Sequence, residues 1–302
     1  MNKRHKKILG GAVTLSLLAA VVISGTLAYL TDSTEQRVNN FTFDSDAVKA
    51  MLTEPEWDGV VDYEYDGDEI IPIYGYTDAD EPIYGYQDGD ESQPVTDKAK
   101  RTDPGVTRAE GEYGDEQAQN MIPGQSAQKN PIITNTGETA DVWVAAKITF
   151  VYGEGSANAG EPLSMADMQK VLDAIEIDYK TSDADNWVRS AGTAETEISQ
   201  VFYYKQILSK DTDAKQGVYG DATTPIFTAV TVKTEANNAQ MKALEEMGGF
   251  AIWIEGFAVQ SDVAADADAF VAWGEAGNVV FEHTPTAAAP ADVTKPGIIP
   301  AN

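Results

Sequence analysis

Short apolar runs separated by turn-forming residues fill the second half of the chain, and this pattern restricts the fold more than any other feature. Val, Ile, Tyr, Phe and Trp dominate these runs, and Gly, Asp, Asn and Ser between them favour turns. Residues 130–153 hold two such runs around Asn135-Thr136-Gly137-Glu138, a spacing that predicts a β-hairpin. The other predicted strands are Ile175–Tyr179, Trp187–Arg189, Ile198–Ile207, Ile226–Val232, Phe250–Val259 and Val279–Glu282.

Both faces of the predicted strand Ile198–Ile207 carry apolar residues, which is typical of a strand packed on two sides. Helices interrupt the strands. Ser164 is placed to cap one of them, and Asn237 or Asn238 a second, which Gly248-Gly249 ends. Residues 266–274 predict a third, short helix. We therefore expect a mainly β fold, a jelly-roll-like β-sandwich with two or three short inserted helices and a β-meander appendage.

A tyrosine-rich segment precedes this region. Ile-Pro-Ile-Tyr-Gly-Tyr at residues 71–76 returns as Glu-Pro-Ile-Tyr-Gly-Tyr at residues 81–86, a period of ten residues. Pro72 and Pro82 lack an N–H group, so we expect them on edge strands. We assign residues 60–120 to an insertion, which consists of a Tyr/Asp-rich meander up to Glu91 and a polar linker after it.

The N-terminal residues have the three parts of an export signal. A basic start is followed by the apolar stretch Ile8–Ile23 and by small residues that favour cleavage between Ala28 and Tyr29. The alternative is an uncleaved anchor, because Ile8–Leu30 is long enough to cross a bilayer. We expect a signal peptide at 1–28, an N-terminal strand segment at 29–59, the rest of the sandwich at 121–283 and a disordered tail at 284–302.

Charge and cysteine content exclude several classes of protein. Removing residues 1–28 removes four positive charges and no negative ones, which takes the formal net charge from −28 to −32. Phosphates would repel so acidic a chain, so we expect no nucleic-acid partner. The chain has no cysteine, so a hydrophobic core rather than disulfides must stabilise it outside the cell.

The residue types for nucleophilic or zinc catalysis are also lacking. The histidines are His5, in the signal, and His283, beside the tail, and no His-Glu-x-x-His motif is present. No pair of carboxylates stands out for glycoside hydrolysis, and we expect a protein that is not an enzyme. Tryptophans in or near the predicted strands favour core packing over sugar binding.

Three acidic turns repeat the pattern Asp-small-Asp-Glu. Hard cations take such oxygen ligands, and calcium is the cation to consider. The spacing differs from the twelve-residue EF-hand loop, so solvated turns without any cofactor are the competing interpretation. The candidate calcium ligands are Asp66, Asp68, Asp78, Asp80, Asp88 and Asp90.

The segment Gly-Thr-Leu-Ala-Tyr-Leu-Thr-Asp at residues 25–32, followed by Asn40 and Phe41, resembles the signal region of the TasA and camelysin (CalY) family. These Gram-positive proteins are exported through a SipW-type signal peptidase. Residues 121–148, with Pro-Gly, Lys-x-Pro and Asn-x-Gly elements, and residues 250–262 are similar to two inner blocks of the family. The resemblance touches about a third of the chain, and the tyrosine repeat lies outside it.

The resemblance implies a secreted structural subunit of an extracellular fibre or biofilm matrix, at the cell surface or in the matrix. In such fibres the N-terminal strand of one subunit completes the sheet of the next. The expected partners are the signal peptidase and further copies of the chain, with no stable membrane span after cleavage. The assembly segment would include Tyr29, Val38, Phe41 and Phe43. The alternative is a monomeric cell-surface module that binds carbohydrate or protein, and a secreted hydrolase is a third hypothesis.

Overall fold

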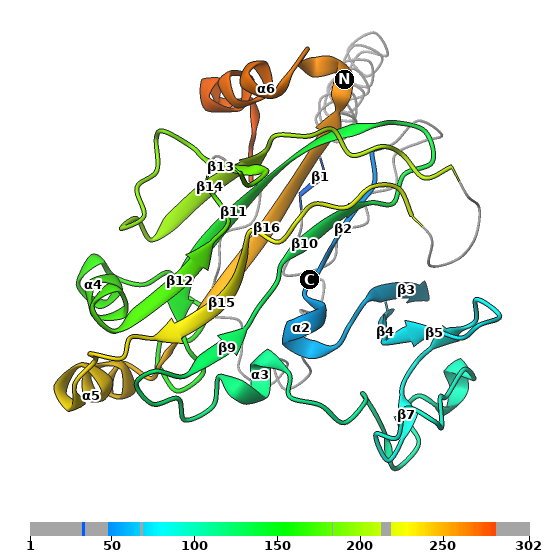
Figure 1. Ribbon diagram of the computed structural model, residues 1–302, viewed down its shortest axis with the longest axis horizontal. Coiled ribbons are helices and arrows are strands. Elements are labelled where there is room, and N and C mark those ends of the chain that lie inside the picture. The colour runs from blue at the N-terminus through cyan, green and yellow to red at the C-terminus, as the bar shows by residue number, and fades with distance from the viewer. Residues whose placement is uncertain (1–31, 34–47, 67–68, 183, 213–218, 282–302) are drawn as a thin grey trace, which may run out of the picture.

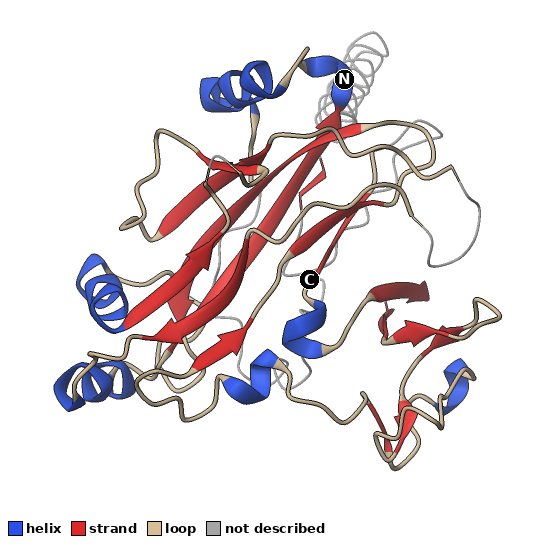
Figure 2. Ribbon diagram, viewed as in Figure 1, coloured by secondary structure: helices blue, strands red, loops and turns tan. Residues whose placement is uncertain are grey.

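The computed structural model describes residues 32–33, 48–66, 69–182, 184–212 and 219–281 (Figures 1 and 2). The fold is mainly β, which confirms the expected class. Ala28, Tyr29, Val38, Phe41 and Phe43 lie outside the described residues, as do the predicted signal peptide and most of the predicted tail. Among the described residues, every helix is too short or too polar to span a bilayer.

A five-stranded antiparallel sheet forms one layer. Its central strands pair over eleven residues, from Val142↔Gln260 to Tyr152↔Phe250. The order is β1 (Asp32–Ser33), β16 (Phe250–Gln260), β11 (Val142–Tyr152), β14 (Ser199–Tyr204) and β13 (Trp187–Arg189).

The second layer joins two smaller sheets. One has the order β12 (Ile175–Tyr179), β15 (Phe227–Val232) and β9 (Ser126–Gln128), and the other pairs β10 (Ile132–Asn135) with β2 (Ala50–Thr53). Backbone hydrogen bonds connect them, because Thr223 N–H donates to the carbonyl of Ile133 and Lys129 N–H to that of Thr228. The chain from residue 126 to 135 thus runs beside the chain from 220 to 232.

The predicted hairpin around Asn135 is wrong. β10 pairs with β2, whereas β11 pairs with β14 and β16. The Asn135 side chain explains the difference, because its Nδ2 donates to the carbonyls of Ala140 (3.0 Å) and Leu208 (3.1 Å). The turn therefore carries the chain from one layer to the other.

The main core lies between the layers. Val144, Ile148 and Phe150 of β11 meet Leu52 and Ile133 of the second layer, and all five are at most 1% exposed. A second cluster covers the outer face of the five-stranded sheet. There α6 (Ala267–Trp273) places Phe270 5.3 Å from the ring of Trp143 and 5.6 Å from that of Tyr203. Both faces of β14 are therefore packed, as its sequence indicates.

The helices begin where their caps predict. Ser164 accepts from Asp167 N–H at the start of α4 (Met165–Ala174), and Asn237 forms a capping box with Gln240 at α5 (Asn238–Glu246). The strand predicted at Val279–Glu282 is absent from the described residues there. After η2 (Ser261–Val263), α6 and the turn η3 (Gly274–Asn278), Val279 and Phe281 pack onto the outer cluster instead of pairing.

The tyrosine-rich insertion forms small sheets of its own beside the two layers (Figure 1). Residues expected as a linker after Ser92 contribute to it, because β8 (Val106–Thr107) pairs with β7 (Tyr86–Gln87) and Tyr84 N–H donates to the Val95 carbonyl. The segment after Ser92 has no apolar periodicity in its sequence and is ordered by backbone hydrogen bonds, so the sequence did not predict β8. The elements of the insertion are β3 (Asp62–Asp66), β4 (Glu69–Ile73), β5 (Gly75–Tyr76), β6 (Pro82–Ile83), β7, η1 (Lys98–Lys100) and β8.

One short helix lies at each end of this insertion. α2 (Pro55–Asp58) leads in and α3 (Gly114–Gln117) leads out. A Cβ on Gly59 would lie 2.9 Å from Cε1 of Tyr113, so the entry and exit of the chain are adjacent. We define residues 60–112 as the appendage, a narrower segment than the 60–120 expected from the sequence.

Deleting the appendage and joining Gly59 to Tyr113 through a short Gly-Ser linker should leave the two-layer fold intact. The loss includes the hydrogen bond from Tyr219 to Asp62, and a bond to a charged group contributes about 1.5–3 kcal/mol. The deletion also removes Arg108, the partner of Asp115 and Glu116, and uncovers Met51. We therefore expect a decrease larger than that of the single bond in the free energy of unfolding, measured by urea titration. Tyr219→Phe in the intact chain is the control that removes this bond alone. A deletion variant without a cooperative transition would show that the appendage belongs to the core.

Candidate functional site

The edge of the five-stranded sheet that receives the N-terminal segment is the strongest candidate for a functional site. β1 pairs there with β16, in the register Asp32↔Ala258 and Ser33↔Phe257. This places a strand directly after the predicted cleavage position, at the outside of the sheet (Figure 1).

Backbone bonds at both ends of the β11–β16 pair determine which way each residue of β16 points. Gly153 N–H donates to the Gly249 carbonyl (3.1 Å) at one end and Ser261 N–H to the Asp141 carbonyl (2.9 Å) at the other. Because hydrogen-bonded pairs alternate along an antiparallel ladder, odd-numbered residues of β16 direct their N–H and C=O groups to β11. The backbone groups of Phe250, Ile252 and Ile254 therefore point to the opposite edge.

Among the described residues, no strand lies on that edge near the start of β16. β1 covers Phe257 and Ala258, but residues 250–254 have no strand on that side within the described part of the chain. Open edges present a row of donors and acceptors to which another strand can add. We call residues 250–254 the open edge.

On the core-facing side of β16, the residues near β1 are more deeply buried than those of the open edge. Ile254 and Ala258 are 2% and 1% exposed, whereas Phe250 and Ile252 contact the same core but are only half-buried. An added strand would cover these two side chains, and burying apolar surface is favourable by about 25 cal/mol per Å².

A buried ion pair lies next to this edge. Lys147 of β11 and Glu255 of β16 are directly opposite in the ladder, with Nζ 2.7 Å from Oε2, and the Glu255 side chain is fully buried. The Lys147 Nζ also lies 6.0 Å from the Trp253 ring centroid. Because a slip by one residue would separate the two charges, the pair fixes the register of β16 against β11.

The structure gives the acidic turns ordinary turn roles. Asp66 forms an ion pair with Lys98 (2.8 Å), and Asp90 accepts from Ser92 and Gln93. Asp80 and Asp88 have φ values of 60° and 53°, which acidic turn residues tolerate better than most. Asp78 is exposed, and Asp68 lies outside the described residues. No three His, Asp or Glu residues among those described are grouped to hold a metal ion.

The repeated tyrosines are mostly turned into the appendage. Tyr84 and Tyr86 are 8% and 9% exposed, and the Tyr84 hydroxyl donates to Glu64. Asp62 accepts a hydrogen bond from the Tyr76 hydroxyl. Its Oδ2 also accepts one from the hydroxyl of Tyr219, at 2.5 Å, and Tyr219 lies 157 residues away in the sequence. Tyr76 and Tyr84 thus hold the appendage together through Asp62 and Glu64, and the contact of Asp62 with Tyr219 docks it.

The same contacts determine the pKa values. Burial raises the pKa of Asp62, although the hydroxyls of Tyr219 and Tyr76 oppose that shift. The hydrogen bond from Lys98 lowers the pKa of Asp66, and the bonds from Gln93 and Ser92 lower that of Asp90. Asp62 and Tyr219 carry no local sequence signal, so sequence reasoning missed both.

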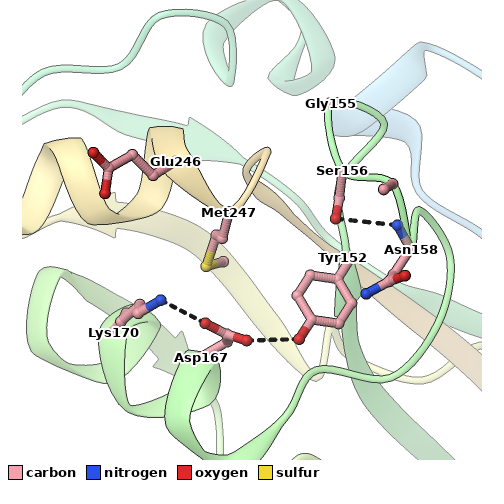
Figure 3. A pocket seen from close by; sticks show the side chains of 9 residues that line it. Tyr152, Gly155, Ser156, Asn158, Asp167, Lys170, Glu246 and Met247 are labelled. Atoms are coloured by element: carbon pink, nitrogen blue, oxygen red, sulfur yellow. Dashed lines mark hydrogen bonds and ion pairs between the residues drawn. The ribbon is translucent and has the colours of Figure 1, made fainter.

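An open cavity of about 390 Å³ lies between the loop 155–158, α4 and the end of α5 (Figure 3). Its central carboxylate is Asp167, which accepts from Tyr152 (2.6 Å), Ser164 (2.7 Å) and Lys170 (2.6 Å). These contacts, with that to Lys170 the strongest, lower the pKa of Asp167 to about 2. Asp167 is therefore a fixed anion in the first turn of α4, next to the capping Ser164, and we assign the cavity no catalytic role.

The tryptophans of the sheet are core residues. Trp187 and Trp143 are fully or almost fully buried, and Trp253 is 9% exposed. Trp273 is half-buried and packs against the outer cluster. Their positions agree with core packing rather than with a surface for sugar binding.

Comparison with known proteins adds no assignment: no protein-family model, curated protein or solved structure matches this chain.

Proposed function

We propose that this chain is a secreted structural subunit of an extracellular fibre or matrix, with a jelly-roll-like sandwich fold, and that it assembles by exchange of its N-terminal strand. The observation that carries the proposal is the open edge of β16, beside a two-residue strand that follows the predicted cleavage position. No cofactor is part of the proposal.

The register of β1 indicates which residues would meet in the assembled form. Carried on residue by residue from Asp32↔Ala258, it places Val38 opposite Ile252 and Asn39 opposite Ala251. Val38 would then share the core-facing side with Ile252 and cover part of its half-buried side chain. Phe41 and Phe43 would follow, beyond the start of β16, and add apolar contacts between subunits.

Cleavage after Ala28 by a SipW-type peptidase would release Tyr29 and the strand that follows it. Until then the segment is attached to the apolar signal and cannot leave its own membrane-bound copy. Coupling of export to assembly explains why a strand begins immediately after the signal. The mature chain, with a formal charge of −32, would act outside the cell or at its surface.

A mixture of two single-cysteine variants tests the exchange directly, because the natural chain has no cysteine. Asn39→Cys and Ala251→Cys would face each other across a pair without mutual hydrogen bonds, where Cβ atoms are closest. Mixing the two mature variants under oxidising conditions should give a disulfide-linked dimer of one copy of each, which non-reducing electrophoresis and mass spectrometry identify.

Asn40→Cys mixed with Ala251→Cys is the matched control. A shift by one residue moves the thiol to the other face of the strand, so this mixture should cross-link much less. Equal cross-linking in both mixtures would argue for random collision. A mature chain that stays monomeric without mixed disulfide would favour the alternative, a monomeric binding module.

A further inference from the structure

A cluster of buried polar atoms lies on the side of the molecule away from the open edge of β16. It is located where β12, an edge strand of the second layer, meets β13, the far edge of the five-stranded sheet. Arg189 ends β13 and is paired with Phe202 of β14. Its guanidinium carbon lies 4.8 Å from the ring centroid of Tyr179 and 5.4 Å from that of Phe202. The two rings are themselves stacked at 5.4 Å, so they hold the guanidinium in a defined orientation.

The guanidinium of Arg189 forms no close hydrogen-bonded ion pair of the kind that the other described arginines form. Arg101 donates to Glu69 at 2.5 Å, and Arg108 donates to Asp115 and Glu116 at 2.7 and 2.5 Å. In the described part of the chain, Arg189 forms an ion pair with Glu195, whose Oε2 is 3.6 Å from Nη1, beyond a good hydrogen bond. The Glu195 side chain is 62% exposed, whereas that of Arg189 is 20% exposed.

Among the described residues, three buried atoms at this place make no hydrogen bond of good geometry: Nε of Arg189, the hydroxyl of Tyr179 and Oε1 of Gln200. The Gln200 side chain lies near enough to the Tyr179 hydroxyl to oppose the rise in the pKa of that hydroxyl. Gln200 is fully buried, and its Nε2 is held by the carbonyls of Glu195 (2.9 Å) and Glu197 (3.2 Å). A buried polar atom without a partner costs about 1–3 kcal/mol, and a ligand with acceptor oxygens would satisfy the two donors of the cluster, Nε of Arg189 and the Tyr179 hydroxyl.

We propose that Arg189 and Tyr179 form a binding site for a carboxylate group of a ligand. The planar fork of the guanidinium matches the two oxygens of a carboxylate, and the Tyr179 hydroxyl supplies a further donor. Tyr179 can turn between the ligand and Gln200, whose Oε1 accepts when the hydroxyl is not engaged. Glu195 competes for the same cation from the solvent side, so it sets how readily an incoming carboxylate binds.

The charge states suit this role. Arginine stays protonated at every relevant pH. Burial raises the pKa of Tyr179, and although the nearby Arg189 opposes the shift, the hydroxyl remains a donor. Small organic acids and acidic protein segments share the carboxylate group, and both are included in the test.

The test uses the mature chain at constant ionic strength, with succinate as one probe and a blocked Asp-Gly-Asp-Glu peptide as the other. Isothermal titration calorimetry measures affinity, and the NMR signal of the Arg189 Nε–H group reports whether the probe reaches this side chain. We expect saturable binding with a shift of that signal. Tighter binding of the peptide would assign the ligand to a protein segment, and tighter binding of succinate to a small acid.

Three variants decide the assignment. Arg189→Lys keeps the charge but loses the fork, and should weaken binding at least tenfold, while Arg101→Lys, at a paired arginine, should not change it. Tyr179→Phe keeps the ring stack and should weaken binding less than Arg189→Lys does. Glu195→Gln should strengthen binding, because it removes the competing carboxylate. Absent binding, equal binding by Arg189→Lys, or a preference for sulfate over both probes would overturn the proposal.

Discussion

Replacing Lys129 with methionine is expected to lower the free energy of unfolding by about 3–5 kcal/mol, because it leaves a buried carboxylate without its cation. Lys129 Nζ lies 2.6 Å from Oε1 and 2.8 Å from Oε2 of Glu54, and the two side chains are 6% and 3% exposed. The ring of Trp57 lies 4.3 Å from the same Nζ and shields it further. Urea unfolding followed by tryptophan fluorescence measures the change.

The double variant Glu54→Gln, Lys129→Met is the control. It removes both charges while it keeps side chains of similar size, so most of the lost stability should return. A single variant that unfolds at the same urea concentration as the natural chain would show that Glu54 finds another partner. A double variant as unstable as the single one would mean that packing, rather than charge, determines the loss.

Local patterns predicted much of the fold. The alternation of apolar residues located β12, β13, β15 and β16, and the capping residues Ser164 and Asn237 located α4 and α5, since both signals act within a few residues. The hairpin at Asn135 failed because the same turn residues also suit a crossover between layers. The choice depends on Leu208, whose carbonyl is 73 residues away in sequence.

The candidate sites depend still more on such distant contacts. Glu54 and Lys129 are separated by 75 residues, and Asp62 and Tyr219 by 157. In one acidic chain with 49 carboxylates, no local pattern indicates which of them is buried and paired. The open edge of β16 is likewise a property of sheet order. The sequence predicted the strand β16 and an N-terminal segment able to add to an edge, but not that the edge of β16 receives it.

Ile252→Pro should abolish assembly while it leaves the monomer folded. The N–H of Ile252 points away from β11, so proline there removes no hydrogen bond from the β11–β16 ladder. It does remove a donor from the open edge, and its ring obstructs an approaching strand. Analytical ultracentrifugation of the mature chain at about 0.15 M salt, where the Debye length is about 8 Å, measures the loss of multimers.

Two substitutions separate this effect from others at the same place. Ile252→Ala removes the half-buried side chain but keeps the N–H, so it should weaken assembly only in part. Ala251→Pro removes an N–H that faces β11, so it should destabilise the monomer itself, which a lower melting temperature would reveal. Because Ala251 is exposed and contributes little to the core, a difference between the two proline variants reports the direction of the backbone N–H. Undiminished multimers with Ile252→Pro would place the contact between subunits at another surface, and the open edge would then be only the end of a sheet.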